Sequence, residues 1–282
     1  MTSKQNTGLK RNILDKYYTS QDTVDKCVNF IRENIEFDRN ADLCIEPSAG
    51  NGAFIQQIKT LSNNCKFYDL HPENNDESKN DIIQQDYLTL DYNNLELKKY
   101  NKVHIIGNPP FGRQSSLAIK FIKKSSKFCD TISFILPKSF KKTSLQKHFP
   151  LNFHLQSQFD LPHYSFLVEG KPYDVPCVFQ IWVKKTTKRS KPVKLVPKNF
   201  SFVKKDDNPD ISFRRVGVYA GKIFKEIEDK SPQSHYFIKF DNKLTDELFV
   251  KLSNITYASK NNTCGPKSIS KQELIKEFNI LF

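Results

Sequence analysis

The 282-residue sequence lacks any apolar run close to the roughly 18 residues that a membrane-spanning helix needs. Its first residues, MTSKQNTGLKRN, have no apolar core after their basic residues, so they are not a secretory signal. No internal repeat is visible. We therefore expect a soluble, intracellular protein with one large domain, or one domain and a smaller companion.

Patterned cysteines are also absent, because no C-x-x-C pair occurs and the six cysteines stand singly. Zinc clusters and disulfide frameworks both favour regular spacing, so we expect reduced thiols and no metal. The cysteines are Cys27, Cys44, Cys65, Cys129, Cys177 and Cys264.

Acidic residues are too few to balance the basic ones. The chain has 44 Lys and Arg against 31 Asp and Glu, a formal net charge of +13 and a sequence pI near 9.3. Such a balance favours a polyanionic partner, because phosphate contacts release counterions. A lysine-rich soluble protein without such a partner is the alternative.

Apolar patterning predicts strands that alternate with helices, which is typical of a doubly wound α/β sheet. We expect helices over 22–34, around Phe54–Leu61 and over 117–128. We expect strands over 42–46, 65–70, 81–86, 102–107, 131–137, 153–161 and 175–183.

Polar side chains stand where four of these strands end. Glu46, Asp69, Asp86 and Asn108 each lie at or directly after the end of an expected strand. Ligands of such sheets bind outside the carboxyl ends of the strands. We therefore expect a binding site at this edge.

The composition changes after the last of these strands. The run KKTTKRSKPVK, residues 184–194, is basic and polar and is interpreted as a linker. Short strand-like runs and two helices come after it, the last opening with the capping-box pattern SKQE at Ser270–Glu273. We predict a first domain over 1–190 and a small α+β module over 195–282.

Two short motifs carry the expected chemistry. In EPSAGNGAF, Gly50 and Gly52 let the backbone approach a ligand at a strand-to-helix turn. In IIGNPPF, two prolines hold an asparagine and a phenylalanine in a rigid cluster of acceptors and one aromatic face. Singly, each motif or acidic residue is also compatible with an ordinary turn.

These motifs resemble motifs I and IV of class I S-adenosylmethionine-dependent methyltransferases that act on the amino group of adenine. The motif order is that of their gamma class, and KYYTSQDTVDKCVNFI at residues 16–31 is similar to its motif X. The resemblance covers roughly residues 15–183. It implies a mostly parallel, seven-stranded Rossmann-like sheet, S-adenosylmethionine as cofactor and a nucleic-acid partner. Motif I departs from the usual start by having Glu-Pro-Ser.

The resemblance also implies roles for single residues. Asn108, Pro109, Pro110 and Phe111 would hold the target amine and stack on its base. The methionine part of the cofactor would contact Tyr18 and Thr19, its ribose Asp69 and its adenine Asp86 and Tyr87. The rest of the cofactor pocket would be formed by Glu46, Pro47, Ala49, Gly50 and Gly52.

Contacts to the substrate are expected from aromatic and basic residues. The loop at 162–177 offers Tyr164, Phe166 and Tyr173 for the second face of the base, and we favour Phe166 or Tyr173. Basic residues expected to meet phosphates are Arg113, Lys138, Arg214 and Arg215.

We therefore predict an adenine-N6 DNA methyltransferase that extrudes its target base. The alternatives are an RNA adenine-N6 methyltransferase, a protein-glutamine methyltransferase and a non-catalytic nucleic-acid-binding subunit. The C-terminal module and the absence of an RNA-binding signature favour DNA over RNA. The basic balance counts against a protein substrate.

Overall fold

The computed structural model describes residues 17–73 and 81–282. Lys16 and the N-terminal segment judged not to be a signal lie outside these ranges. The chain divides into two compact units, one with the described residues up to Lys191 and one with Pro192–Phe282. Within the described ranges, no helix is long and apolar enough to cross a membrane.

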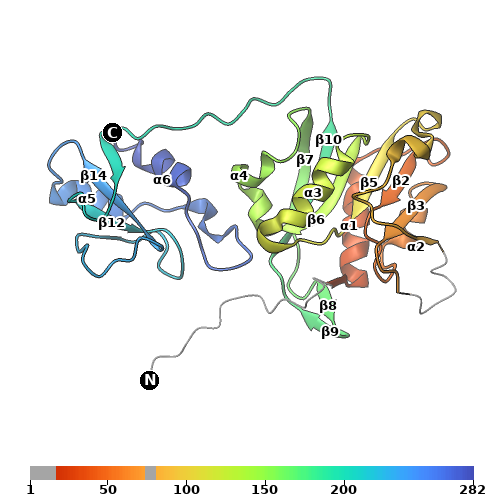
Figure 1. Ribbon diagram of the computed structural model, residues 1–282, viewed down its shortest axis with the longest axis horizontal. Helices are drawn as coiled ribbons and strands as arrows, with labels where there is room; N and C mark the ends of the chain where they lie inside the picture. Colours follow the sequence, from red (N-terminus) through yellow and green to blue (C-terminus); the bar gives the residue numbers. More distant parts are fainter. Residues whose placement is uncertain (1–16, 74–80) are drawn as a thin grey trace. The chain divides into compact units, whose positions relative to one another are not determined.

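The first unit is built on a seven-stranded sheet, as predicted (Figure 1). Six strands run in the same direction, and β10 runs antiparallel to both of its neighbours, β6 and β7. In spatial order the strands are β4 (Ile82–Gln84), β3 (Asn64–Asp69), β2 (Leu43–Glu46), β5 (Val103–Gly107), β6 (Thr131–Pro137), β10 (Cys177–Lys184) and β7 (Phe153–Asp160).

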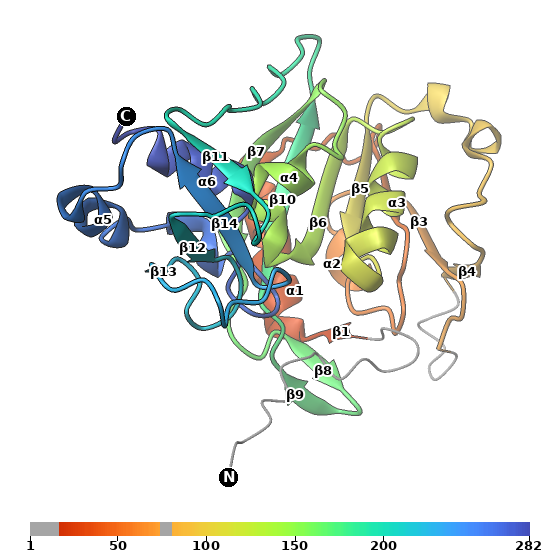
Figure 2. The ribbon, with the colours of Figure 1, turned by 60° about the vertical axis from the view of Figure 1, so that its left-hand side comes forward.

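Helices cover both faces of this sheet, which makes it doubly wound (Figure 2). Helices α1 (Gln21–Asn34) and α2 (Ile55–Lys59) pack on one face, and α3 (Ser116–Ser125) packs on the other. Neighbouring residues of the strands alternate between the two cores, as Ile105 and Ile106 do on β5. Shorter helices are η2 (Tyr92–Leu95), η3 (Leu97–Lys99), η4 (Arg113–Ser115), η5 (Lys138–Lys141) and α4 (Thr143–Gln146).

A small second sheet corrects the expectation of a loop over 162–177. Strand β1 (Tyr18–Thr19) pairs with β8 (Phe166–Val168), which forms a hairpin with β9 (Lys171–Tyr173). The hairpin turns at Glu169 and Gly170, which both have positive φ. Strands of two or three residues are too short to show an alternating pattern, so the sequence did not reveal them.

Strand β10 begins at Cys177, two residues later than predicted. Pro176 has no backbone N–H to give to a neighbouring strand. Its carbonyl instead accepts a hydrogen bond of 3.0 Å from the backbone N–H of Lys138.

Part of the expected linker is attached to the first unit. The backbone N–H of Lys185 donates to the Asn152 carbonyl at 2.7 Å, and that of Arg189 donates to the Leu151 carbonyl at 2.7 Å. The Arg189 guanidinium also lies 5.0 Å from the ring of Trp182. Residues 185–189 are therefore not a free tether.

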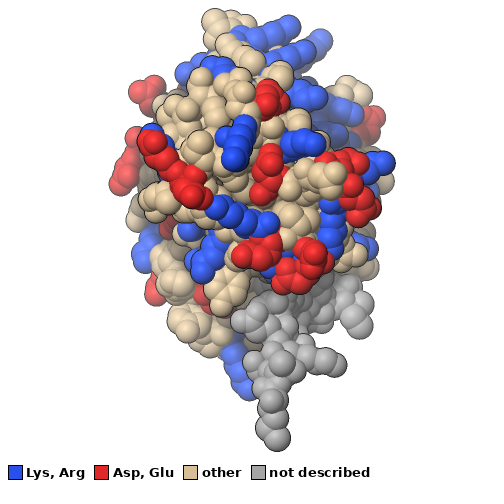
Figure 3. Space-filling model, turned by 90° about the vertical axis from the view of Figure 1, so that its left-hand side faces the viewer, with Lys and Arg blue, Asp and Glu red and all other residues tan. Residues whose placement is uncertain are grey.

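The second unit is a four-stranded antiparallel sheet with helices. The strands lie in the order β11 (Phe200–Val203), β14 (His235–Phe240), β12 (Ile211–Arg214) and β13 (Ile223–Phe224). Its helices are α5 (Asp246–Ser253), η6 (Ala258–Asn261) and α6 (Lys271–Phe278). The predicted capping box is present at the start of α6. In the view of Figure 3, Lys and Arg are interspersed with Asp and Glu rather than gathered in one patch.

Candidate active site

A cleft of about 430 Å³ opens at the carboxyl ends of β2, β3 and β5. The chain order reverses between β2 and β5, which is the switch point where α/β sheets bind ligands. Of the residues predicted to hold a cofactor or a target amine, only Gly52 is not among those that line the cleft. Those that do are Tyr18, Thr19, Glu46, Pro47, Ala49, Gly50, Asp69, Asp86, Tyr87, Asn108, Pro109, Pro110 and Phe111.

The glycine turn and Asp69 form one hydrogen-bonded unit. The backbone N–H of Gly50 donates to Asp69 Oδ2 at 2.7 Å, and that of His71 donates to Asp69 Oδ1 at 2.8 Å. Gly50 has a φ of +56°, which a residue with a side chain rarely adopts. These two bonds fix the carboxylate while leaving lone pairs for hydroxyl donors in the cleft.

Tyr18 packs against this turn from β1. Its hydroxyl donates to Glu73. Burial raises the pKa of Tyr18, and this hydrogen bond raises it further. A Cβ on Gly50 would lie 3.5 Å from the Tyr18 ring. The ring therefore forms one wall of the cleft and carries no charge at neutral pH.

Glu46 is a buried carboxyl group with an unused oxygen. Glu46 is 1% exposed, and its Oε2 has no hydrogen-bond partner among the described residues. Burial, and then the nearby Asp69 charge, raise the pKa of Glu46 well above its ordinary value. Such a group requires a partner, since an unpaired buried polar atom is unfavourable.

Asn108 is held by both its side-chain amide and its backbone. Its Nδ2 donates to the Tyr17 carbonyl at 3.1 Å and to Thr19 Oγ1 at 3.2 Å. Its backbone carbonyl accepts from Ser48 Oγ at 3.1 Å. Among the described residues, Asn108 Oδ1 and the Pro109 carbonyl remain as acceptors without a hydrogen bond.

Tyr17 is a site residue that the sequence did not reveal. Its ring is near-parallel to that of Phe111, with centroids 6.3 Å apart, and to that of Tyr173, with centroids 5.7 Å apart. The motif X resemblance directed attention to Tyr18 and Thr19 instead. A second aromatic residue, directly before Tyr18 in the sequence, was the available signal.

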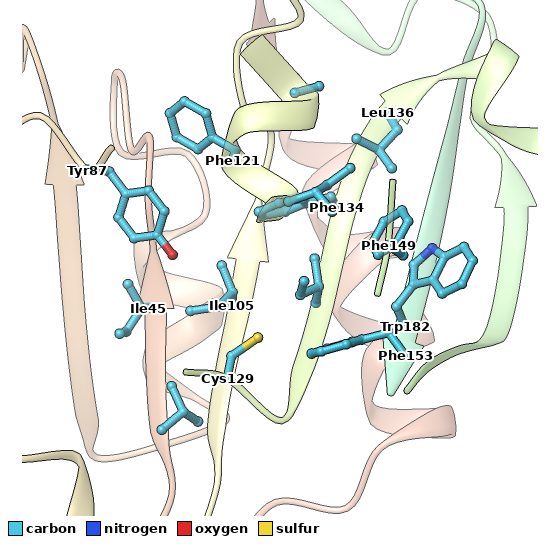
Figure 4. Packing of buried hydrophobic residues seen from close by; sticks show 14 of the residues in the cluster. Ile45, Tyr87, Ile105, Phe121, Cys129, Phe134, Leu136, Phe149, Phe153 and Trp182 are labelled. Carbon is cyan, nitrogen blue, oxygen red and sulfur yellow. The ribbon is translucent and has the colours of Figure 1, made fainter. Parts of the chain in front are cut away.

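Tyr87 and Asp86 contribute differently from one another. The Tyr87 side chain packs in the core near Phe121 (Figure 4). Its hydroxyl lies 2.8 Å from Ser125 Oγ. Asp86 Oδ1 accepts from the backbone N–H of Leu88 at 2.9 Å. Tyr87 therefore supports the cleft wall, while the Asp86 carboxylate keeps further acceptor capacity.

The residues predicted to contact the nucleic acid differ in whether they already interact with other residues of the protein. Arg113 is exposed and stands two residues after Phe111, the last residue of the Asn-Pro-Pro-Phe motif. Lys138 lies 2.9 Å from Asp160 in an ion pair, and Phe166 is fully buried. Lys138 is therefore already paired with a carboxylate, and Phe166 is not accessible at the surface.

Arg214 and Arg215 are bound within the second unit. Arg214 donates to the Val216 carbonyl at 2.8 Å and to Ser234 Oγ at 2.9 Å. Arg215 donates to the Gln233 carbonyl at 3.2 Å. Both guanidinium groups thus help to hold the local fold.

Nothing in the described ranges resembles a metal centre. No three His, Cys, Asp or Glu side chains there come together in a way that could hold an ion. The groups that line the cleft are oriented acceptors and aromatic faces.

No protein-family model matches the chain, and no curated protein matches it either. Solved structures with a similar fold exist. One is a Listeria monocytogenes protein provisionally described as a class I S-adenosylmethionine-dependent methyltransferase, with 14% identity and a TM-score of 0.45 over 65% of this chain and 66% of that one.

Two others are described as acting on ribosomal RNA. The 23S rRNA methyltransferase ErmE has 10% identity and a TM-score of 0.44, over 63% of this chain and 73% of its own. An rRNA methylase from Streptococcus thermophilus has 11% identity and a TM-score of 0.39, over 58% of this chain and 97% of its own. Residue roles in this chain rest on its own geometry.

Proposed function

We propose that this protein transfers a methyl group from S-adenosylmethionine to the N6 amino group of an adenine extruded from DNA. The observation that carries the proposal is the Asn108 amide, whose nitrogen is engaged at 3.1 and 3.2 Å while its oxygen stays available. This acceptor lines the same cleft as the glycine turn and Asp69.

The cleft residues suit this cofactor. The Asp69 carboxylate, fixed by Gly50 and His71, would accept from the ribose hydroxyls. Glu46, with its unpartnered buried oxygen, would accept from the ammonium group of the methionine part. When bound, the cofactor supplies an electrophilic methyl group on a sulfonium.

The protein would then act mainly by orientation. The lone pair of an adenine amine is delocalised into the ring, so the amine is a poor nucleophile. Asn108 Oδ1 and the Pro109 carbonyl would accept its two N–H bonds and favour a tetrahedral nitrogen with its lone pair facing the methyl group. As the nitrogen–carbon bond forms, the sulfur–carbon bond would break and leave a neutral thioether, so no charged base is needed for this step. The methylated nitrogen would then carry a positive charge and lose one proton to water.

Aromatic rings would hold the extruded base. Two rings that enclose a base lie about 7 Å apart, because stacked planes are separated by about 3.5 Å. The Phe111 and Tyr17 centroids are only 6.3 Å apart, so the two rings would have to move apart to admit a base between them. Stacking of about 1–3 kcal/mol would offset much of the cost of extrusion.

DNA is the favoured polymer because a separate compact unit follows the catalytic one, where the gamma class reads its target. The net charge of +13 supports a polyanionic partner. Arg113, beside the catalytic motif, is the best-placed phosphate contact. Tyr173 is better placed than the buried Phe166 to reach a base.

The first prediction concerns Asn108 and Phe111. Asn108→Ala and Phe111→Ala should each lower the rate of methyl transfer about 100-fold, because an oriented acceptor or a stacking face is lost. Cofactor affinity should persist. The protein is incubated with labelled cofactor and duplex DNA, single-stranded DNA, structured RNA or peptides, and nucleosides are analysed after digestion.

Phe159→Ala is the matched control, since Phe159 is half-buried and packs on Phe30 with ring centroids 4.9 Å apart, and neither ring lines the cleft. It should retain activity. Label on RNA adenine alone would assign the RNA alternative. Label only on cytosine or peptide, or full activity of the Asn108→Ala protein, would overturn the proposal.

A further inference from the structure

We propose that Thr19 is a positioning residue that orients the Asn108 amide for methyl transfer. Its hydroxyl and the Tyr17 carbonyl would together keep Asn108 Oδ1 as the end that the substrate amine meets. This inference rests on the proposed function. It differs from the contact with the cofactor that the sequence resemblance assigns to Thr19.

The orientation of the amide follows from what its neighbours can do. A backbone carbonyl only accepts hydrogen bonds, so the group 3.1 Å from the Tyr17 carbonyl must be the Nδ2 of Asn108. If the amide were turned by 180°, Asn108 Oδ1 would face the Tyr17 carbonyl, and two acceptors would meet. Thr19 Oγ1, at 3.2 Å, accepts the second N–H of the same nitrogen.

The fold holds the Thr19 hydroxyl in place. Thr19 is 6% exposed and pairs with Phe166 of β8, which is fully buried. The next residue continues this attachment, because the Ser20 backbone N–H donates to the Ser165 carbonyl at 2.9 Å. The two acceptors that fix Asn108 therefore come from a packed segment rather than a loose side chain.

Thr19 also lines the cleft, so its two roles have to be separated by experiment. A hydroxyl can accept one hydrogen bond and still donate its own proton. Contact with a cofactor would therefore be compatible with holding Asn108. If a Thr19 variant loses only a contact with the cofactor, its rate of methyl transfer returns to that of the wild type at saturating cofactor. If it loses the orientation of the Asn108 amide, the rate stays low.

The test compares Thr19→Val, Thr19→Ala and Thr19→Ser in the full chain. The readout is the single-turnover rate of methyl transfer to adenine with saturating protein and cofactor. Removal of the hydroxyl should slow this rate about tenfold, as expected for one lost hydrogen bond. Thr19→Ser keeps the acceptor and should restore the rate to near that of the wild type.

Thr23→Val is the matched control. Thr23 is 3% exposed in α1, and its hydroxyl is bonded to Ser20 at 2.9 Å rather than to Asn108. This variant should keep the wild-type rate. Melting temperatures of all variants show whether each is folded, and Thr19→Ala serves if Thr19→Val is not.

Three results would overturn the inference. They are wild-type rates in folded Thr19→Val or Thr19→Ala at saturating cofactor, an equal loss in Thr19→Ser, and an equal loss in Thr23→Val. Failure of the proposed function itself is distinguishable, because wild-type protein would then transfer no methyl group to adenine in any polymer.

Discussion

His104 is a fully buried imidazole near the amino end of β5, away from the cleft. Its Nδ1 lies 2.8 Å from Thr131 Oγ1 and its Nε2 lies 3.2 Å from Asp42 Oδ2. Asp42 in turn accepts from the backbone N–H groups of Asp38 and Lys102. The His104 side chain thereby joins β5 to β6 and to the residue directly before β2, at the edge opposite the cleft.

Burial lowers the pKa of His104, more than Asp42 raises it. The unfolded chain therefore takes up a proton on this ring as the pH falls below about 6.5, while the folded chain does not. The stability contribution of the neutral ring is present above that pH and is lost as the pH falls towards the folded-state pKa.

The corresponding prediction is that His104→Gln reduces the loss of stability between pH 7.5 and about 5.5. The variant itself should cost roughly 1–3 kcal/mol at pH 7.5, because two buried hydrogen bonds are changed. Urea unfolding of both proteins across this range measures it. Parallel pH curves would contradict the assignment.

Elements with strong periodicity were predictable from the sequence. All seven predicted sheet strands and helices α1, α2 and α3 are present near their predicted bounds, because all of them except the edge strand β4 bury an apolar face. Strands β1, β8 and β9 were not found, since pairs and triplets of residues have no period. Tyr17 and the Asn108–Thr19 bond depend on these strands, so they were not predictable either.

The start of helix α6 was predictable from four residues, Ser270–Glu273. Ser270 Oγ accepts from the Glu273 backbone N–H at 3.3 Å, and the Glu273 carboxylate accepts from the Ser270 backbone N–H at 2.7 Å. The apolar residues of the helix, Leu274, Ile275 and Phe278, enter the core of the second unit.

Ser270→Ala should therefore destabilise the second unit by about 1 kcal/mol, because an orphan N–H at the helix start loses its acceptor. Amide hydrogen exchange at Glu273 should quicken several-fold. Ser201→Ala, at an exposed position of β11, serves as the control and should leave exchange at this amide unchanged. An unchanged exchange rate in Ser270→Ala would show that the cap does not stabilise the helix.

On the scale of the whole molecule, the cleft and the C-terminal unit occupy separate parts of the chain. Among the described residues, those that line the cleft all belong to the first unit, between Tyr17 and Phe121. The second unit has its own sheet, helices and core. We expect cofactor binding to need the first unit alone, and polymer binding to need both.

A chain ending at Lys191 tests this division. It should bind S-adenosylmethionine with an affinity within about threefold of the full chain, but bind duplex DNA at least about tenfold more weakly, because phosphate contacts are lost. Calorimetry and filter binding at one fixed salt concentration give the two values. Equal DNA affinity would remove the second unit from recognition.

The pairing of β1 with β8 joins Tyr18 to Leu167, across most of the first unit. The ribosome makes the glycine turn and Asn-Pro-Pro-Phe long before it makes β8. During synthesis, the glycine turn and the Asn-Pro-Pro-Phe motif therefore exist before β1 can pair with β8. We therefore expect ligand binding to begin only after β8 has been synthesised and has paired with β1.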